Sequence, residues 1–549
     1  MALPAALVPL RHPVFRMLWI TNLVVSFGVW MQNTGAGWLM ATLSPDPMTV
    51  SLVSVATILP VFLLALPAGA LADIVDKRLF IIATQSWMLA VAALLALLTY
   101  AGWVGSSTLL MLTFALGLGA AMNNPAWGTV LSEAVPRRDL VQAIALNGVG
   151  FNLARAIGPA LAGVLVVFGG PELAFALNAL SYLAIIFVLL MWRRTRVRSF
   201  TLPREHLISA MRAGMRFVRH SPVMRAAMAR TAAFFFAAAA PWAMLPLVVK
   251  EQLGLGAGSF GILLGLMGGG GVAAGMLLPQ VRARLSRGAT VFAASLSAVA
   301  GMALLATAQH GAQAALAMVL FGIGWVASSS VAQGAAQLAA PAWVRSRALA
   351  IYQLGFNFAL GLGTLFWGWL GTRVGLQSAM LAAAATGLVL AFLARRFDID
   401  REPDATATTS HTLPAPEAVD PDLVSVMPKV RGHVLESQRY RIDAADRDRF
   451  LRVMAELRDV RGRAGAIDWH LYEDIAHADA WMEVWTVENW SDHLRESSRM
   501  DAADRAALAR AMALHRGEPS PPSRYLAVTP RTAGPPSTAR PAPPSIPAR

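Results

Sequence analysis

The chain has 549 residues, of which 56% are hydrophobic and only 14% are charged, and its mean hydropathy is +0.53. A soluble domain carries roughly 25% charged residues, so this composition excludes a wholly soluble protein and indicates one that spans a membrane. The formal net charge is +14, and the absence of cysteine excludes disulfides, cysteine-based metal sites and thiol chemistry.

Twelve apolar stretches are close to the length of about 20 residues that a membrane-spanning helix needs. The predicted spans cover residues 15–39, 49–72, 79–101, 106–131, 140–168, 172–192, 229–250, 258–280, 288–309, 313–339, 345–372 and 376–395. We therefore predict an all-α membrane protein of twelve spans.

Basic residues alternate between the loops and predict the orientation of the spans. They precede the first span and follow the even-numbered ones, with a dense basic run at residues 193–225, whereas the other loops carry almost none apart from Lys250 and Arg373. Basic loops stay on the cytoplasmic side of a membrane. We expect a multi-pass protein of the bacterial inner membrane with both termini in the cytoplasm.

An internal repeat with a period of about 205 residues indicates two related halves. The segment Asn147–Gly163 (NGVGFNLARAIGPALAG) matches Tyr352–Gly368 (YQLGFNFALGLGTLFWG), and the shared glycines fall in register. Upstream, Gly117 and Gly119 match Gly322 and Gly324. We expect six-helix halves at residues 1–192 and 229–396, joined by a cytoplasmic loop at 193–228.

The composition changes after the last span and predicts a further domain. Residues 397–424 read as a solvated linker, and 529–549 as a disordered Pro-rich tail. Between them, strand-like stretches at 434–442, 466–475, 481–487 and 524–528 alternate with helical ones at 444–461 and 491–514. This β-α-β-β-α-β order predicts a cytoplasmic α+β ferredoxin-like domain at residues 425–528.

The loop at residues 69–78 (GALADIVDKR) carries an acidic and basic motif. A carboxylate at a helix end facing basic loops could form an ionic latch that is closed in one conformation and broken in another. Alternatively, it only marks the side of the membrane on which the loop lies. The motif resembles the G-x-L-x-D signature of the major facilitator superfamily, which implies a gating role for Gly69, Asp73, Asp76, Lys77 and Arg78. The corresponding loop 275–288 keeps the basic residues but has no acid, so we expect a one-sided latch.

The fifth predicted span carries spaced glycines that end in a Gly-Pro pair. Glycine and proline weaken a membrane helix locally, so Gly158 and Pro159 are predicted to let it bend. The spacing of Gly150, Gly158 and Gly163 resembles the fifth-span motif of superfamily exporters, although Ala154 replaces an expected glycine. This resemblance implies outward transport.

Arg155 is a charged residue in the middle of that span, where a charge faces a cavity or a partner. It could bind substrate or take part in coupling, or it could hold a structural network, and its counterpart in the repeat is Leu360. Other polar residues within spans could line a cavity or form packing hydrogen bonds: Gln32, Asn33, Asn123, Asn124, Asn152, Gln353 and Asn357. Proton coupling is implied by the resemblance, without an identified carrier residue.

Residues 467–499 resemble the C-terminal region of exporters related to the enterobactin exporter, and they are similar to monooxygenase-type folds. His470, Glu473, Asp474, His493 and Arg495 form either a site or part of an ordinary surface. The histidines lack ligand spacing, so no metal site is predicted. The tryptophans of this segment suggest a sheet core or a pairing face, and the domain is therefore a candidate for homodimerisation.

These observations predict a secondary transporter that exports a small amphipathic molecule, such as a siderophore, drug or metabolite, by proton-coupled alternating access. Its expected partners are that molecule, protons and the lipid bilayer, with no cofactor and no nucleic acid. The chain has no phosphate-binding loop of the G-x-x-x-x-G-K-[ST] type, which argues against an ATP-driven pump. The alternatives are a membrane-anchored enzyme with a catalytic tail domain and a signalling or assembly protein that the spans only anchor.

Overall fold

The computed structural model describes residues 5–136, 139–191, 207–341, 344–400, 433–500, 502–518 and 520–527. Three predicted segments lie outside these residues: the linker beyond residue 400, the C-terminal tail, and residues 193–206 of the basic run 193–225. The chain divides into two compact units, one comprising residues 1–211 with 222–402 and the other residues 212–221 with 403–549. Each unit is described by itself.

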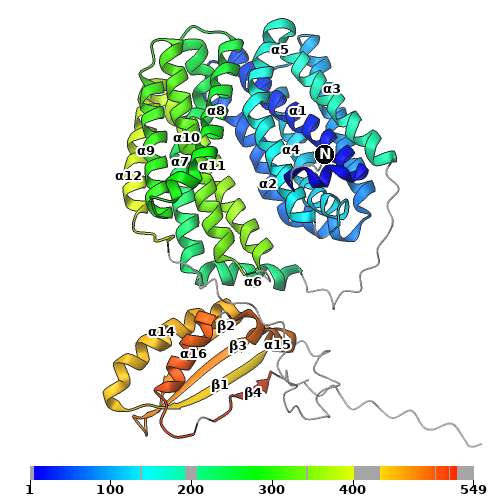
Figure 1. Cartoon of the computed structure of the whole chain (residues 1–549). Coiled ribbons are helices and arrows are strands. Elements are labelled where there is room, and N and C mark those ends of the chain that lie inside the picture. The colour runs from blue at the N-terminus through cyan, green and yellow to red at the C-terminus, as the bar shows by residue number, and fades with distance from the viewer. Residues whose placement is uncertain are drawn as a thin grey trace, which may run out of the picture. The chain divides into compact units, whose positions relative to one another are not determined.

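The first half of the helical unit contains five long helices after a short 3-10 helix, η1 (Ala5–Arg11) (Figure 1). They are α1 (Pro13–Leu43), α2 (Pro47–Ile74), α3 (Lys77–Tyr100), α4 (Ser106–Glu133) and α5 (Leu140–Met191). Helix α5 has 52 residues, but its backbone leaves the helical conformation at Gly169 and at Gly170, where φ is 73°. Because glycine adopts positive φ at little cost, the chain reverses there and α5 supplies two of the predicted spans.

The second half repeats this arrangement with α7 (Pro222–Leu247), the π-helical η3 (Val248–Gln252), α8 (Ala257–Arg282), α9 (Arg287–Ala306), α10 (Gly311–Ala339), α11 (Arg345–Val374) and α12 (Leu376–Ala394). Among the described residues, eleven helices are long and apolar enough to cross a membrane, and the break in α5 brings the segments to the twelve expected. Helix α7 begins at Pro222, so residues 222–228 are not loop as predicted; proline suits the first helical turn, and alanines follow it.

The glycines of the sequence repeat make matching contacts in the two halves. A Cβ atom at Gly158 would lie 2.7 Å from Trp30 Cβ on α1, and one at Gly363 would lie 2.8 Å from Ala239 Cβ on α7. Gly117 packs against α2 and its counterpart Gly322 against α8. Since α7 and α8 are the repeats of α1 and α2, the structure confirms that the halves are duplicates.

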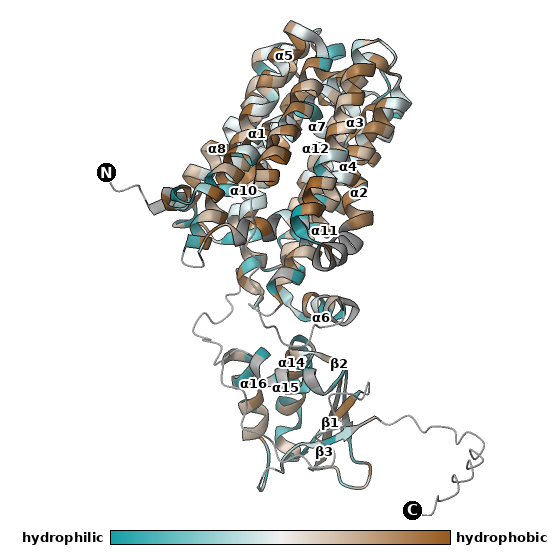
Figure 2. Ribbon diagram, turned by 90° about the vertical axis from the view of Figure 1, so that its right-hand side faces the viewer, coloured by the Kyte–Doolittle hydropathy of each residue, from teal (hydrophilic) through white to brown (hydrophobic). Residues whose placement is uncertain are grey.

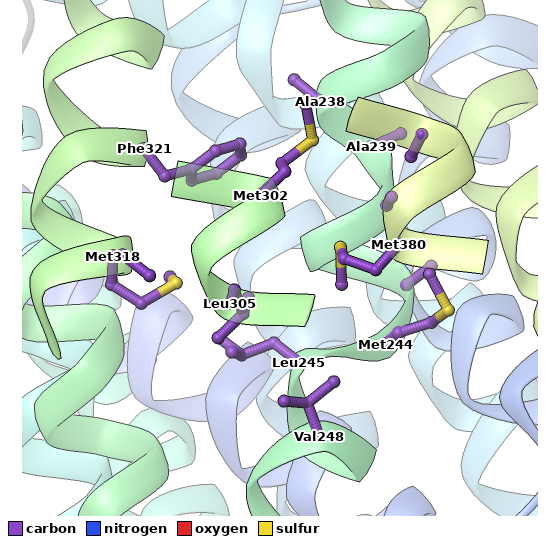
Figure 3. Packing of buried hydrophobic residues seen from close by; sticks show 14 of the residues in the cluster. Ala238, Ala239, Met244, Leu245, Val248, Met302, Leu305, Met318, Phe321 and Met380 are labelled. Carbon is purple, nitrogen blue, oxygen red and sulfur yellow. The ribbon is translucent and has the colours of Figure 1, made fainter. Parts of the chain in front are cut away.

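The interior of the bundle is packed with small and flexible apolar residues, and its outer surface is also apolar. Figure 3 shows methionines of α7, α9, α10 and α12 in one buried cluster with Phe321, Ala238 and Ala239. Many large apolar side chains remain exposed, as with Phe168 at 85% and Met276 at 73%, and the helices are strongly hydrophobic in Figure 2. An exposed apolar surface of this extent is expected where lipid replaces water.

The second unit contains a four-stranded antiparallel sheet in the order β2-β3-β1-β4. Its elements are β1 (Val434–Arg441), η4 (Ala444–Asp446), α14 (Arg447–Ala464), β2 (Ala466–Glu473), β3 (Ala480–Val487), α15 (Trp490–Arg499), α16 (Ala502–Ala513) and β4 (Ser523–Leu526). The ferredoxin-like topology is confirmed. The helix predicted at 491–514 is divided because Met500 takes an extended conformation with ψ of 131°.

Part of the loop between the helical halves also belongs to the second unit. Helix α6 (Leu207–His220) begins the described part of the loop, and its residues from Arg212 onward belong to the same unit as the ferredoxin-like domain. Arg212 and Arg216 each lie 3.6 Å from the carboxylate of Glu488, and a Cβ atom at Gly462 would lie 2.7 Å from the His220 ring. The central loop is therefore partly helical.

Candidate substrate cavity

A cavity of about 1140 Å³ lies between the two halves of the helical unit. Helices α1, α2 and α5 line it from the first half, and α7, α8, α10 and α11 line it from the second. Its volume exceeds the roughly 300–1,000 Å³ of a typical small-molecule pocket. A site in the middle of the helices, at the interface of two repeats, is where secondary transporters bind substrate.

One end of the cavity is closed by contacts between the halves. A Cβ atom at Gly163 of α5 would lie 2.8 Å from Gly261 Cα of α8, and the matching Gly368 of α11 packs against Ser51 of α2. At the same end, Lys250 Nζ donates to the Ala41 carbonyl at 2.7 Å. Lys250, an exception to the predicted charge pattern, therefore joins η3 to the end of α1.

The cavity is accessible from the other end, where the predicted basic loops lie; we call this the basic end of the bundle. Gly148 of α5 and Gly275 of α8 line the cavity near this end, and a Cβ atom at either would have no neighbour within 4 Å. Helices α5 and α8 therefore touch at one end and diverge toward the basic end.

The structure separates the polar residues that the sequence could only group together. Asn33, Asn152, Arg155 and Gln353 line the cavity, whereas the remaining four candidates, Gln32, Asn123, Asn124 and Asn357, do not. Gln32 accepts a hydrogen bond from Asn178 at 3.3 Å, and Asn123 accepts from Thr84 and Gln85 at 3.3 and 3.4 Å. These two residues take part in helix packing, the second of the roles that the sequence left open.

Arg155 is the one charged residue among the described residues that line the cavity. Within the part of the chain that the structure describes, its guanidinium forms no hydrogen bond or ion pair. The corresponding position of the second half, Leu360, lines the cavity as well. The two halves thus present a cation and an apolar side chain at equivalent places.

A continuous series of aromatic rings crosses the cavity from one half to the other. Successive ring centroids are 6.2 Å apart for Phe151–Trp30, 6.4 Å for Trp30–Trp242 and 5.5 Å for Trp242–Trp325. Phe235 then lies 4.7 Å from Trp325 and 4.4 Å from Phe356. All six residues line the cavity. Aromatic residues are also ordinary components of apolar spans, so the sequence alone does not distinguish these six from the others.

The predicted gating motif has a structural role in this conformation. Asp76 caps the N-terminus of α3 by accepting hydrogen bonds from the backbone amides of Arg78 and Leu79. The Arg78 guanidinium donates to the carbonyls of Leu189 and Leu190 at 2.7 and 2.8 Å, at the end of α5. Asp73 and Gly69 lie in α2, and their side chains are outside the described part of the structure. The gating role of the motif stays a prediction.

An acid from elsewhere in the chain lies at the basic end of the second half, and the prediction of a one-sided latch stays a prediction. Asp400, which follows α12, accepts hydrogen bonds from the amides of Arg287 and Gly288 at 2.5 and 2.9 Å, at the N-terminus of α9. Burial alone would raise the pKa of Asp400, but hydrogen bonds from Ser286 and from these amides lower it overall. The acid is absent from loop 275–288 because it comes from more than 100 residues later in the chain.

Helix α5 continues without a break through Gly158 and Pro159. The departures from helical geometry recorded in α5 fall at Gly169 and Gly170. In this conformation Gly158 serves close packing against Trp30. Bending at Gly158 and Pro159 therefore stays a prediction about a different conformation.

Most of the tail residues considered as a site lie apart on the surface of the ferredoxin-like domain. His470 pairs with Asp468 at 3.0 Å, Glu473 with Arg447 at 2.8 Å, and Asp474 with a neighbouring histidine at 3.5 Å. The side chain of Arg495 is outside the described part. His493 differs, because it is buried and lies 2.7 Å from Glu436. The structure thus does not assemble these residues into one site.

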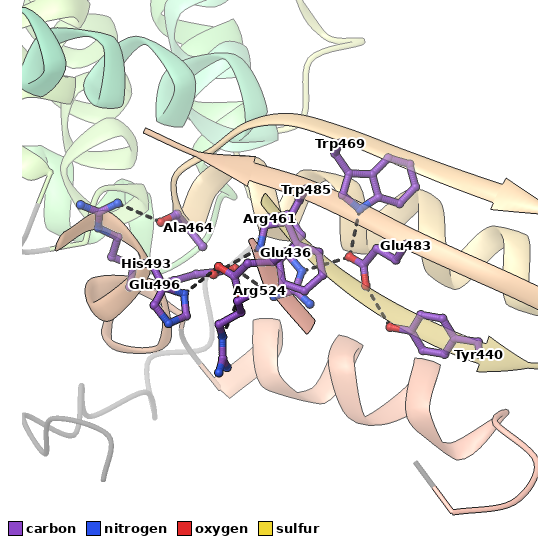
Figure 4. A network of polar contacts seen from close by, with 11 residues as sticks. Glu436, Tyr440, Arg461, Ala464, Trp469, Glu483, Trp485, His493, Glu496 and Arg524 are labelled. Carbon is purple, nitrogen blue, oxygen red and sulfur yellow. Dashed lines mark hydrogen bonds and ion pairs between the residues drawn. The ribbon is translucent and has the colours of Figure 1, made fainter. Parts of the chain in front are cut away.

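A buried ionic network occupies the interior of the same domain (Figure 4). Arg461 donates to Glu483 at 3.0 Å and to Glu496 at 2.9 Å, and its guanidinium lies 3.5 Å from the centre of the Trp485 ring. Tyr440 and Trp469 also donate to Glu483, and the buried carboxylate raises the pKa of the Tyr440 hydroxyl beyond the effect of desolvation. The tryptophans are therefore partly core and partly hydrogen-bond donors.

The network contains a group that the sequence did not reveal as potential metal ligands. Ligand atoms of Glu436, His493 and Glu496 lie within 4.8 Å of one another, although Glu436 is on β1 and the others are on α15. Each carboxylate already faces a cation or an indole N–H, from Arg461, Arg524, Trp485 or His493. We therefore assign these residues to the ionic network and propose no metal there.

Solved structures of transporters resemble the fold of the helical unit. A bacterial homologue of the human lysosomal transporter Spinster, in an inward-facing conformation, aligns with a TM-score of 0.58 over 74% of this chain and 100% of its own, at 15% identity. An inward-facing bacterial homologue of the iron transporter ferroportin aligns with a TM-score of 0.56 over 70% of this chain and 97% of its own, also at 15% identity. These likenesses establish the fold.

Two proteins with related sequences are also transporters by name. The staphyloferrin A transporter of Staphylococcus aureus is 24% identical over 48% of this chain and 66% of its own length. An uncharacterised MFS-type transporter of Sinorhizobium fredii is 28% identical over 42% of this chain and 57% of its own. The matched region thus spans less than two thirds of each relative.

The solved structures show the fold, and the family pattern that matches the chain shows that it is a transporter of the major facilitator superfamily rather than an enzyme. Within that class, the chain belongs to the family described as "Transmembrane secretion effector", whose pattern matches residues 4–532. The match includes the ferredoxin-like domain, so that domain lies within the region that the family shares.

Proposed function

We propose that this protein exports a small amphipathic molecule, such as a siderophore, drug or secondary metabolite, across the bacterial inner membrane by alternating access driven by proton influx. The observation that carries the proposal is the cavity between the halves, which both halves line and which is accessible from one end and closed at the other. Alternating access requires a site of this kind, opened to one side of the membrane at a time.

The direction of transport is proposed from the charges and from the family. If the basic loops face the cytoplasm, as the positive-inside rule requires, then the cavity in this conformation is accessible from the cytoplasm and both termini are cytoplasmic. The family description refers to secretion, and one relative is named for staphyloferrin A transport. Binding of the transported molecule from the cytoplasm, followed by its release outside, is consistent with the family description and with the name of this relative.

Proton coupling is proposed from the superfamily resemblance. Among the described residues that line the cavity there is no aspartate, glutamate or histidine. The proton would therefore be carried outside this lining, and Asp73 would act in the gating motif. Asp76, Lys77 and Arg78 would help to hold the basic end in one of its conformations.

Transport in proteoliposomes tests this function. Compounds selected by growth protection of efflux-deficient cells would be assayed for counterflow and for transport driven by an imposed pH gradient. We expect counterflow with wild-type protein, faster transport with the gradient, and a loss of gradient-driven transport in Asp73→Asn. Transport that ignores the pH gradient would refute proton coupling, and absence of counterflow for every protective compound would refute the transporter function itself.

We also propose that the ferredoxin-like domain pairs with a second copy through the open face of its sheet. Tyr525, at 58% exposure, lies opposite Leu435 in the strand register, and Tyr472 of β2 is 50% exposed. Because the chain has no cysteine, a single Tyr472→Cys substitution gives an unambiguous cross-link. We expect a disulfide dimer from Tyr472→Cys and none from Glu456→Cys on α14; equal cross-linking of both would contradict pairing through the sheet.

A further inference from the structure

The cavity carries a charge that its own lining does not neutralise. Arg155 is the one charged group among the described lining residues, and within the described structure no carboxylate or carbonyl is recorded as its partner. A cation inside a membrane protein is costly unless it faces a partner or a water-filled cavity, and removing its hydration makes an anionic ligand favourable. The electrostatics of the cavity therefore favour a negatively charged group over a neutral or positive one.

A second donor lies in the same part of the cavity. The indole Nε1–H of Trp242 is buried without a hydrogen-bond acceptor among the described residues. Trp242 and Arg155 also line a smaller recess that adjoins the cavity, together with Trp30 and Trp325. A buried donor without an acceptor is costly, and an oxygen of a bound ligand would satisfy it. Arg155 and Trp242 both offer N–H groups, so the ligand must supply acceptors.

The rest of the cavity surface is suited to an apolar body. The rings from Phe151 to Phe356 give a surface on which an aromatic or aliphatic framework can lie, since aromatic side chains contribute large apolar areas. Leu360 continues this surface at the position that repeats Arg155. The charge thus comes from the first half and much of the apolar surface from the second.

From these three observations we propose that the cavity binds an amphipathic anion, with its carboxylate at Arg155 and Trp242 and its apolar framework along the aromatic rings. The inference rests on the proposed transport function, because it specifies the class of molecule that the transporter carries. It assigns Arg155 to substrate binding rather than to a structural network. Selectivity against cations follows from the absence of any acidic side chain in the described lining.

Equilibrium binding of three matched probes tests the proposal without requiring transport. The probes are 1-naphthylacetate, its neutral amide and 1-naphthylethylamine, titrated calorimetrically into the purified full-length protein. We expect wild-type protein to bind the carboxylate most tightly. Arg155→Gln should weaken carboxylate binding by roughly 30-fold or more, the lower end of the loss when one partner of a buried charge pair is removed, and should leave amide binding much less affected.

Two further variants keep the test independent of folding defects. Arg155→Glu should reverse the preference in favour of the amine, a gain that a misfolded protein cannot show. Arg373→Gln is the matched control, because this exposed arginine lies over Trp369 at the closed end of the bundle and does not line the cavity. Its affinities should equal those of the wild type.

Wild-type protein that binds the carboxylate no better than the amide would overturn the proposal, as would an Arg155→Glu variant that does not gain preference for the amine. These outcomes concern charge recognition in binding. A protein that binds the carboxylate selectively but shows no counterflow would instead contradict the transport function, so the two failures are distinguishable.

Discussion

Arg155 marks a place in the cavity lining where the two duplicated halves differ in charge. Glycines at equivalent positions of α5 and α11 are retained, but Leu360 stands where Arg155 is expected by the repeat. A duplication that keeps the backbone contacts and differs in charge at this position of the lining makes the cavity asymmetric. That asymmetry gives an amphipathic ligand a defined orientation, with its charged end toward the first half.

Asp400 provides a prediction about the basic end. Its carboxylate caps α9, so Asp400→Asn should lower stability by about 1 kcal/mol at pH 7, because it removes a negative charge from a helix N-terminus. Because the pKa of Asp400 is lowered in the folded protein, its stabilisation is present above the unfolded pKa of about 3.9 and is lost as the pH falls through the folded value.

Thermal unfolding of the detergent-purified protein between pH 7 and pH 3 measures this effect. Wild type and Asp400→Asn should differ at pH 7 and converge at the acid end. A difference that is constant across this range would show that the carboxylate charge does not stabilise the helix.

Arg461 provides a prediction about the ferredoxin-like domain. Arg461→Met would leave Glu483 and Glu496 buried without their cation, which typically costs about 3–5 kcal/mol. The control is Arg510→Met, because Arg510 pairs with Glu456 on the surface and such pairs contribute about 0–1 kcal/mol. Hydrogen exchange of peptides from β1 and β3 should accelerate strongly in the first variant and little in the second; equal acceleration would contradict a central role for Arg461.

At the residue scale, the sequence identified the polar residues of the cavity only in part, for physical reasons. A charge or an amide within an apolar span is visible in the sequence, which is why Arg155, Asn33 and Asn152 could be named. Whether an amide faces a cavity or another helix depends on helix rotation, so Gln32 and Asn123 could not be distinguished from them. The role of Asp400 depends on a contact across 113 residues and is invisible to local patterns.

At the element scale, small residues determine where helices of opposite halves touch. In a membrane, helices associate through close packing rather than through exclusion of water, and glycine permits the closest approach. Gly163 meets Gly261 where α5 crosses α8, and Gly368 meets Ser51 where α11 crosses α2. The two crossings are related by the repeat, so the contacts that close the cavity were duplicated with the fold.

These crossings give a prediction about conformation. A side chain at position 163 would collide with backbone atoms, 2.8 Å from Gly261 Cα and 3.0 Å from the Ala257 oxygen, so Gly163→Val should separate α5 from α8. Spin labels at Phe168 and Gln309 report the distance between the halves at the closed end. We expect a longer distance in Gly163→Val, whereas Gly148→Val should leave it unchanged because position 148 faces open space. Identical distributions in both variants would contradict this account of closure.

Element boundaries were predictable wherever composition changes sharply. The twelve spans follow from apolar length, and the ferredoxin-like order follows from alternating periodicities. The start of α7 was placed too late because Arg225, the last residue of the basic run, makes its first turns look like loop. Arg230 of the same helix is buried and donates to the carbonyls of Phe397 and Gly288 at the basic end. A buried arginine can lie within a membrane helix when it donates to carbonyls of neighbouring segments. The polarity of the sequence does not reveal such partners.

At the scale of the whole molecule, a duplicated fold encloses a cavity that is closed at one end. The rival in which the spans only anchor a signalling or assembly protein would not require that cavity to open toward the opposite side. An exporter requires it, because the bound molecule must leave on the side from which it did not enter. Access to a cavity residue from both sides of the membrane therefore separates these accounts without knowledge of the substrate.

Reaction of Ser54→Cys with a membrane-impermeant thiol reagent is the most direct test. Ser54 lines the cavity, and the natural chain contributes no background because it has no cysteine. Reference variants are Gly105→Cys in the loop between α3 and α4 and Arg284→Cys in the loop between α8 and α9, which should each react from one side only. We predict that Ser54→Cys reacts from the outside in intact cells and from the cytoplasmic side in inverted vesicles. Reaction from one side alone, under conditions that label both reference variants fully, would contradict alternating access.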